Sequence, residues 1–188
     1  MSRVILGVDP GLTRCGVAVV RANDRRMVEL VHVDTLKTSA DMELSERLLD
    51  IGARIEKLIV EHRPDQIAIE RVFAQANVRS VMGVAQISGV VLYLAKKHGV
   101  TIQMHTPSEV KAAVTGSGRA EKAQIGSAVA KILGLSSIPK PADSADAIAI
   151  AICNAWRKGL PNSAKSARTS AQEAWITAER VASRKPTT

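Results

Sequence analysis

Four acidic residues have the types and positions expected of a site that acts on phosphate through metal ions. Each stands where a predicted strand ends or a predicted helix begins. Asp9 follows the apolar run 4–8, and a proline and a glycine directly after it end that strand. Glu70 ends the apolar run 66–69 in the same way.

Asp143 and Asp146 are three residues apart at the head of the apolar segment 147–156, so in a helix both carboxylates share a face. Three separate segments therefore supply carboxylate oxygens, which are the ligands that Mg²⁺ and Mn²⁺ prefer. The alternative is that these acids are solvated or cap elements. Asp143 fits that alternative well, because an acid at a helix N-terminus interacts favourably with the helix dipole.

The composition indicates one folded domain with a basic surface. The chain has 188 residues, 46% of them apolar, and a net charge of +8, which favours a polyanionic substrate. Residues 160–188 hold five basic and two acidic residues, a net charge of 5 − 2 = +3, so residues 1–159 carry the other 8 − 3 = +5. The basic character is therefore not confined to the tail.

Nothing in the sequence indicates a membrane segment or an export signal. The longest uncharged run, residues 80–95, is 16 residues long and contains polar residues and glycines, so it is typical of a buried helix. We expect a cytoplasmic protein without membrane association. Cys15 and Cys153 lack metal-ligand spacing and are predicted to be reduced, partly buried thiols, and the four histidines are scattered.

The pattern of apolar residues predicts an α/β fold. Three strands in tight succession form an antiparallel meander, and later strands joined by helices pair in parallel, which gives a mixed five-stranded sheet flanked by helices. The predicted strands are 3–9, 14–21, 27–36, 67–70 and 100–104, and the predicted helices are 42–62, 77–98, 107–115, 121–133 and 143–156. Sites in such sheets form at the carboxyl ends of strands, where Asp9 and Glu70 lie.

The domain division follows from composition. Residues 1–158 are predicted to form the folded domain, and residues 159–188 a basic, flexible C-terminal tail, because that stretch is rich in Ser, Ala, Thr and Lys and poor in apolar residues.

Two lysines flank a glycine-containing break between two predicted helices. Lys111 precedes the Gly116-Ser117-Gly118 break and Lys122 follows it. Free backbone N–H groups at Gly118 and at the start of the second helix can hold a phosphate between these lysines, and Arg119 adds a third positive charge. The alternative is that they are ordinary solvated side chains.

Two apolar features are candidates for binding surfaces. Phe73, the only Phe, stands in a polar stretch just after Glu70 and can stack on an unpaired base, or else covers the core. The predicted helix 77–98 is apolar on more than one side. A stripe left over after packing on the sheet favours a twofold self-interface, and the alternative is a helix buried wholly within one subunit.

These motifs together resemble the RuvC family of Holliday junction resolvases over residues 3–158. The resemblance rests on motifs in matching order and spacing: Gly7-Val8-Asp9-Pro10-Gly11 followed by Gly16, Ile69-Glu70 followed by Phe73, the stretch 111–124, and Ala142-Asp143-Ser144-Ala145-Asp146-Ala147. It implies an RNase H-like fold, a homodimer and paired, metal-dependent cuts in four-way DNA junctions during recombination and repair. RuvA and RuvB type branch-migration partners are implied as well.

The resemblance also assigns roles to residues. It places the catalytic acids at Asp9, Glu70, Asp143 and Asp146, the functional lysines at Lys111 and Lys122, and the base-contacting aromatic at Phe73. Two Mg²⁺ or Mn²⁺ ions per site are expected, with Asp9 bridging, Glu70 and Asp146 on the nucleophile side and Asp143 on the leaving-group side. Four carboxylates this close raise one another's pKa, so metal binding is expected to release protons.

Three other functions compete with this interpretation. An actin-like ATPase or sugar kinase also places an acid and a glycine after its first strand, but that architecture needs two such domains. An RNase H-like RNA-processing nuclease shares the fold. A non-catalytic junction-binding protein predicts binding without cleavage, and the complete set of four acids counts against it.

Overall fold

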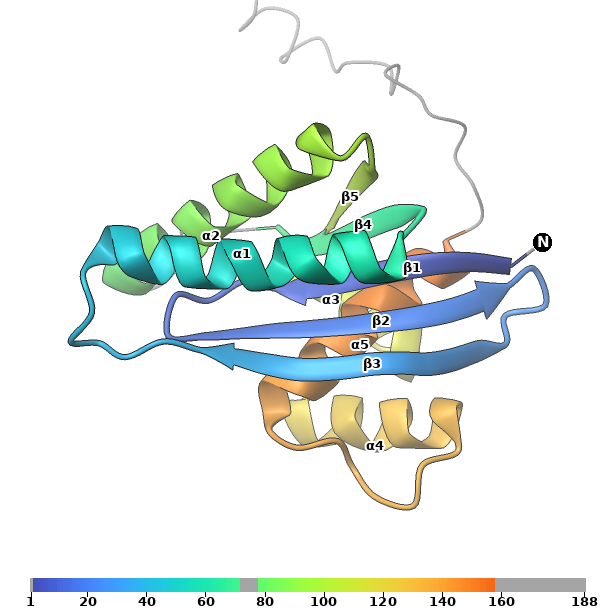
Figure 1. Ribbon diagram of the computed structural model, residues 1–188. Helices are drawn as coiled ribbons and strands as arrows, with labels where there is room; N and C mark the ends of the chain where they lie inside the picture. Colours follow the sequence, from blue (N-terminus) through green and yellow to red (C-terminus); the bar gives the residue numbers. More distant parts are fainter. Residues whose placement is uncertain (1, 72–77, 158–188) are drawn as a thin grey trace, which may run out of the picture. The chain divides into compact units, whose positions relative to one another are not determined.

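The sheet has five strands in the order β3-β2-β1-β4-β5, with β1 at its centre. In this computed structural model, which describes residues 2–71 and 78–157, β1 runs antiparallel to β2, and β2 antiparallel to β3, whereas β4 is parallel to β1 and to β5 (Figure 1). The predicted meander followed by parallel strands is confirmed. The strands are β1 (Ser2–Asp9), β2 (Arg14–Asn23), β3 (Val28–Lys37), β4 (Gln66–Glu70) and β5 (Thr101–His105).

Helices cover both faces of the sheet. Alternate residues of a strand point to opposite faces, so β1 sends Leu6 and Val8 to one core cluster and Ile5 to the other. One face packs against α1 (Leu44–His62) and α2 (Val78–Lys97). The opposite face packs against α5 (Ala142–Trp156), with α3 (Pro107–Thr115) and α4 (Lys122–Leu133) beside it (Figure 1).

Local signals place the element ends within about two residues of the prediction. At the start of α3, Thr106 Oγ1 accepts a hydrogen bond from the Glu109 backbone N–H, and the Glu109 side chain accepts one from the Thr106 N–H, as the predicted capping box requires. Gly116 and Gly134 end α3 and α4 in the left-handed conformation, with φ of 80° and 65°.

The predictions for the cysteines, for membrane helices and for the C-terminal tail differ in how far the structure tests them. Cys15 and Cys153 are free and buried, with exposed fractions of 0% and 7%, deeper than the partly buried thiols expected. No described helix is long and apolar enough to cross a membrane. Phe73, Asn77 and the predicted tail 159–188 lie outside the described residues, so the division into domain and tail stays a prediction.

Candidate active site

Asp9 and Glu70 are brought together by the pairing of two parallel strands. The register pairs Val8 of β1 with Ile69 of β4, so the next residue on each strand is one of the two acids. Both strands run in the same direction, and their carboxyl ends therefore deliver the two carboxylates to one edge of the sheet. Both residues are partly buried there.

The two acids of α5 reach this edge because glycines let the helix lie directly on the strands. A Cβ atom on Gly16 of β2 would stand 2.2 Å from the backbone oxygen of Asp143, and one on Gly7 of β1 would stand 2.3 Å from that of Ala147. No side chain fits in either place. The absence of side chains at these two positions sets how near the first turns of α5 come to Asp9.

A buried hydroxyl pair fixes the same end of α5 to the outer strand of the meander. Thr35 Oγ1 of β3 lies 3.0 Å from Ser144 Oγ, and both side chains are buried. Ser144 directly follows Asp143 in the chain. This hydrogen bond therefore holds the helix start in register with the sheet, next to the contact at Gly16.

The electrostatics show that the four acids form one coupled group. Burial, together with the negative charges of Asp146, Glu70 and Asp143, raises the pKa of Asp9 to about 7, against the opposing charge of Lys122. Burial also raises the pKa of Glu70, with Asp146 adding to the shift. The structure thus brings the four predicted acids together, while their catalytic and metal-binding roles stay predictions.

Cations neutralise part of this negative charge. Lys122 Nζ lies 3.3 Å from Asp146 Oδ2, and Arg14 Nη1 lies 3.9 Å from Asp143 Oδ2. The negative charge of Asp146 is the largest cause of the raised pKa of Lys122. Both cations are more than half exposed, so these ion pairs stabilise the fold little. Another cation can therefore replace Arg14 or Lys122 beside the two acids.

The donor set fits a divalent cation bound through oxygen. Within residues 2–71 and 78–157, no three His, Cys, Asp or Glu side chains converge closely enough to hold a metal ion as they stand. Asp143 and Asp146 instead face Arg14 and Lys122. Because all four acids are hard oxygen donors in one coupled group, rotation away from these cations would direct their oxygens to a shared ion.

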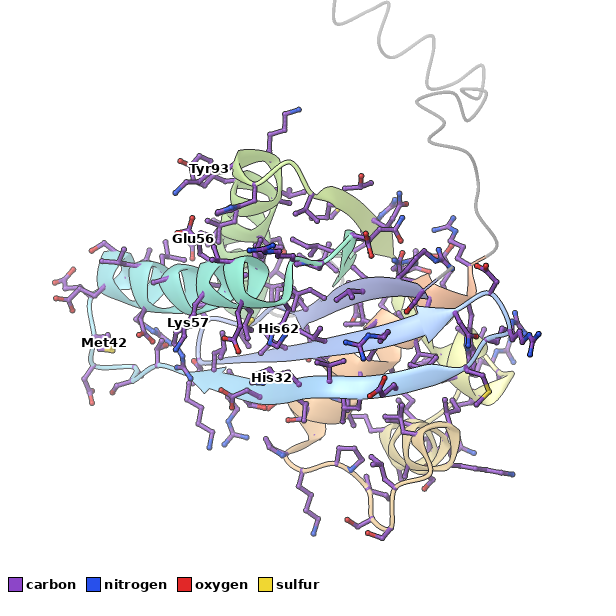
Figure 2. All side chains as sticks on the ribbon, turned by 45° about the vertical axis from the view of Figure 1, so that its right-hand side comes forward. His32, Met42, Glu56, Lys57, His62 and Tyr93 are labelled. Atoms are coloured by element: carbon purple, nitrogen blue, oxygen red, sulfur yellow. The ribbon has the colours of Figure 1, made fainter. Side chains whose placement is uncertain are left out.

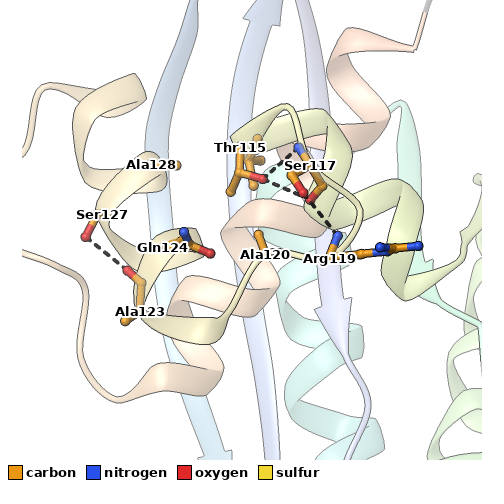
Figure 3. Close-up of a pocket in the computed structure, with 9 residues that line it drawn as sticks. Thr115, Ser117, Arg119, Ala120, Ala123, Gln124, Ser127 and Ala128 are labelled. Atoms are coloured by element: carbon orange, nitrogen blue, oxygen red, sulfur yellow. Dashed lines mark hydrogen bonds between the residues drawn. The ribbon is translucent and has the colours of Figure 1, made fainter.

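The predicted basic residues occupy two neighbouring places. Lys111 and Lys122 both lower the pKa of Glu70, so both act on the acid cluster. Arg119 instead lines a cavity of about 700 Å³ with residues of α3, of α4 and of the break between them, among them Thr115, Gln124 and Ser117 (Figure 3). Neither Lys111 nor Lys122 lines this cavity.

Three of the backbone amides before α4 are already paired, whereas the phosphate cradle at Gly118 and the start of the helix stays a prediction. The Arg119 N–H donates to Ser117 Oγ at 3.3 Å, and the Ala120 N–H donates to the Ser117 carbonyl at 3.2 Å. The Glu121 N–H donates to Gln124 Oε1 at 2.8 Å. The lysine side chains are further groups that this segment offers to a phosphate.

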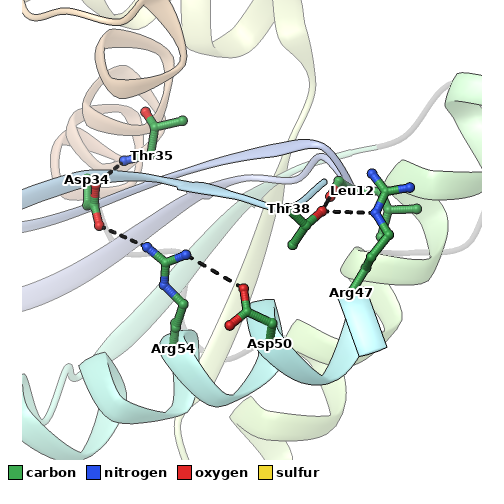
Figure 4. Close-up of polar contacts among 7 residues, drawn as sticks. All are labelled: Leu12, Asp34, Thr35, Thr38, Arg47, Asp50 and Arg54. Carbon is green, nitrogen blue, oxygen red and sulfur yellow. Dashed lines mark hydrogen bonds and ion pairs between the residues drawn. The ribbon is translucent and has the colours of Figure 1, made fainter. Parts of the chain in front are cut away.

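Two arginines in or next to the site were not predicted from the sequence. Arg14 lies beside Asp143. Arg14 is on β2, two residues before Gly16, which pairs with Asp9. A position so close to the end of β1 could have indicated that Arg14 lies near the acids. Arg47 of α1 donates through Nε to Thr38 Oγ1 at 2.9 Å, and that hydroxyl donates to the Leu12 carbonyl at 2.6 Å (Figure 4). Arg47 therefore anchors the turn after Asp9, a contact between distant segments that no local pattern indicates.

Comparison with known proteins identifies the family. Residues 5–154 match the family model described as crossover junction endodeoxyribonuclease RuvC. The chain belongs to the RuvC family. The RuvC proteins of Leifsonia xyli and Paenarthrobacter aurescens are 50% and 51% identical to it, over 96% and 98% of this chain and 93% and 100% of theirs.

A solved structure of the family has the same fold. The structure described as T. thermophilus RuvC in complex with Holliday junction substrate aligns with a TM-score of 0.77 and 35% identity, covering 81% of this chain and 93% of that one. The RNase H-like fold predicted from the sequence is confirmed. Membership of an endodeoxyribonuclease family decides against the ATPase and RNA-processing alternatives.

Proposed function

We propose that this protein resolves four-way DNA junctions by paired, symmetric, metal-dependent hydrolysis of phosphodiester bonds. Membership of the RuvC family supports the substrate. The coupled group of four carboxylates, in which the pKa of Asp9 is raised to about 7, is the observation that carries the chemistry. Cleavage leaves 5′-phosphate and 3′-hydroxyl ends, and its biological setting is homologous recombination and DNA repair.

The four acids hold the divalent ions in this proposal. Asp9 is central because it ends the middle strand of the sheet, with Glu70 on one side and the α5 acids on the other. When bound, Mg²⁺ or Mn²⁺ supplies a hydroxide nucleophile and neutralises the leaving oxygen. The protein supplies the negative charge that retains the ions and the rigid strand ends that position the ligands.

The lysines bind and orient the DNA strand next to the acids. Lys122 is 76% exposed and lies within 3.3 Å of Asp146, and Lys111 acts on Glu70 from α3. These two positive charges next to the acids favour the binding of a phosphate group there. Lys122 then exchanges its partner Asp146 for the phosphate, which frees that carboxylate for the metal.

A homodimer is the assembly we propose, and α2 supplies the surface. The outward side of α2 presents Met82, Ala85, Gly89 and Tyr93 at helical spacing, with Met82 55% and Tyr93 66% exposed. Figure 2 labels Tyr93 on this helix. Ile87, Val91 and Leu94 form the other apolar side of the helix and are buried against the sheet. Large apolar side chains around small residues suit close packing of two copies of the helix.

We also propose RuvA and RuvB type proteins as partners and the cytoplasm as the place of action. The substrate favours that location, because recombination intermediates form in chromosomal DNA. Phe73 and Arg119 are proposed to contact the junction DNA, Phe73 by stacking on an unpaired base.

The proposal is tested by cleavage of a synthetic four-way junction beside a linear duplex of the same sequence, in Mg²⁺ and in chelator. Cleavage of the junction alone, and only with metal, is the expected result. Equal cleavage of the duplex would contradict the structural specificity. Junction binding without cleavage under every metal condition would favour the non-catalytic alternative.

A further inference from the structure

A second cavity opens directly beside the acid cluster. It has a volume of about 700 Å³ and lies between α4, the start of α5 and the loop 134–141 that joins them. We call it the flanking pocket. Its lining residues are Lys122, Ala123, Gly126, Ile138, Pro139, Lys140, Pro141, Ala142, Ala145 and Asp146.

The flanking pocket is continuous with the active site. Asp146 and Lys122 line it, and the same two residues belong to the coupled group around Asp9. A DNA strand whose phosphate lies at the acids therefore has its next nucleotide at the mouth of this pocket. Lys140, an exposed second cation on the lining, favours the entry of a polyanion.

The walls of the pocket are apolar. Apart from Lys122, Lys140 and Asp146, every lining side chain is Ala, Ile or Pro, or is absent at a glycine. The neighbouring cavity in Figure 3 differs, because Thr115, Ser117, Arg119, Gln124 and Ser127 give it a polar lining. An apolar wall that ends in two lysines suits a nucleotide. The flat face of the base and the carbon atoms of the sugar can contact the apolar wall, and the charged phosphate can contact the lysines.

Ile138 is held in place on this wall although it is exposed. Its exposed fraction is 43%, yet its Cγ2 atom lies where a Cβ atom on Gly126 would stand only 2.7 Å away. The side chain thus rests on the bare backbone of α4. An exposed isoleucine seated in this way presents a fixed apolar surface to whatever enters the pocket.

We propose that the flanking pocket binds the sugar and base of the nucleotide next to the scissile phosphate. This inference rests on the proposed function and adds a subsite to it. Its volume lies in the range of about 300–1,000 Å³ usual for ligand pockets. Because the uncharged lining side chains carry no hydrogen-bonding group, the base is held by van der Waals contact and recognised by its shape.

The test compares two exposed apolar residues of the same loop. Ile138 lines the pocket and is 43% exposed, whereas Leu135 does not line it and is 38% exposed. Ile138→Ser is expected to slow single-turnover junction cleavage about tenfold, and Leu135→Ser to leave it within about twofold. Equal rates in the two variants would overturn the proposal. Thermal unfolding of both variants checks that each is folded.

Modified junctions provide a measurement on the unaltered protein. An abasic nucleotide is placed on one side and then on the other side of the scissile phosphate. On one side only, the abasic nucleotide is expected to slow junction cleavage by the wild-type protein about tenfold. The same abasic nucleotide should not slow cleavage by Ile138→Ser any further. Replacing the base at that position by another base should slow the wild-type protein less than removing it. Indifference of the wild-type protein to both abasic positions would overturn the proposal, whatever the variants do.

The same experiment separates failure of the subsite from failure of the function. A wild-type protein that cuts no junction in Mg²⁺ or Mn²⁺ contradicts the proposed function itself. A wild-type protein that cuts the unmodified junction but tolerates both abasic positions leaves that function intact and contradicts only the flanking pocket.

Discussion

The two faces of the sheet are packed in different ways, and only one of them builds the site. Towards α1 and α2 the core consists of large side chains, among them Ile51, Ile55, Ile67, Ile69 and Ile87. Towards α5 the strands present the small residues Gly7, Gly16 and Ala18, and the helix packs its small residues Ala147 and Ala151 against them. The α5 face also contains large side chains such as Ile5 and Ile148, but at Gly7 and Gly16 it brings the helix backbone directly onto the strands.

The difference explains where precision is needed. Large side chains can adjust by changing rotamers when a neighbour changes, so the α1 face tolerates small errors of volume. Backbone oxygens in contact with glycine cannot move without moving the helix. The α5 face therefore fixes the distance between the acids of α5 and Asp9, while the α1 face supplies bulk stability.

The largest effect on junction cleavage is expected from substituting Asp9, which lies next to α5. Asp9→Asn removes the central ligand and should lower junction cleavage by a factor of about 10³ or more. It should also stabilise the metal-free protein. The folded-state pKa of about 7 exceeds the unfolded value, so the cost of ionising Asp9 grows as pH rises from about 4 to about 7 and is then constant.

Unfolding by urea at pH 4 and pH 8, without metal, measures this effect. The stability gain of Asp9→Asn should be small at pH 4 and larger at pH 8. A gain that does not depend on pH would show that Asp9 titrates normally and that the acids are not coupled.

The second effect compares the same substitution on the two faces. Gly16→Ala places a methyl group 2.2 Å from the Asp143 carbonyl oxygen, whereas Gly52→Ala on α1 meets only the side chain of Val90, at 3.1 Å. Gly16→Ala should displace the start of α5 and slow cleavage about 100-fold. Gly52→Ala should leave cleavage unchanged and shift stability by no more than about 1 kcal/mol. Similar losses in both would break the contrast between the faces.

The third effect concerns the charge opposite the α5 acids. Lys122→Gln should slow cleavage about tenfold, because it removes the cation beside Asp146, and Lys131→Gln at the other end of α4 is the charge-matched control. Lys122 lowers the pKa of Asp9, so its removal should also move the acidic limb of the pH–rate profile to higher pH. A profile that stays in place would separate Lys122 from the acid cluster.

The smallest effect on activity is expected in the opposite core. Ile55→Val shortens a fully buried side chain on α1 and should cost about 1 kcal/mol of unfolding free energy. Junction cleavage below the unfolding transition should stay at the wild-type rate. A loss of activity beyond about threefold would show that the α1 face also sets the geometry of the site.

The sequence predicted the features that have local causes. Strand-ending residues after Asp9, the capping box at Thr106 and the apolar periodicities are short-range signals, and all of them gave elements close to those observed. The strand order then placed Asp9 and Glu70 at one edge, as parallel pairing requires.

Features that depend on the meeting of distant segments could not be predicted in this way. Gly16 was known only as part of a motif; its contact with Asp143 depends on how α5 crosses β2. The sequence left open which stripe of α2 faces outward, since periodicity shows that the helix is apolar on more than one side but not which side packs on the sheet. The flanking pocket depends on the path of the loop 134–141, which contains no periodic pattern.

The central claim is that acids from three separate segments form one coupled site, and the pKa of Asp9 tests it most directly. The measurement is an NMR titration of the Asp9 carboxyl carbon in the metal-free protein and in Asp146→Asn. The account predicts a pKa of about 7 in the wild-type protein and a lower pKa in the variant, since Asp146 is the strongest of the charges that raise it. An ordinary carboxyl pKa in the wild-type protein, or one that Asp146→Asn leaves unchanged, would contradict the account.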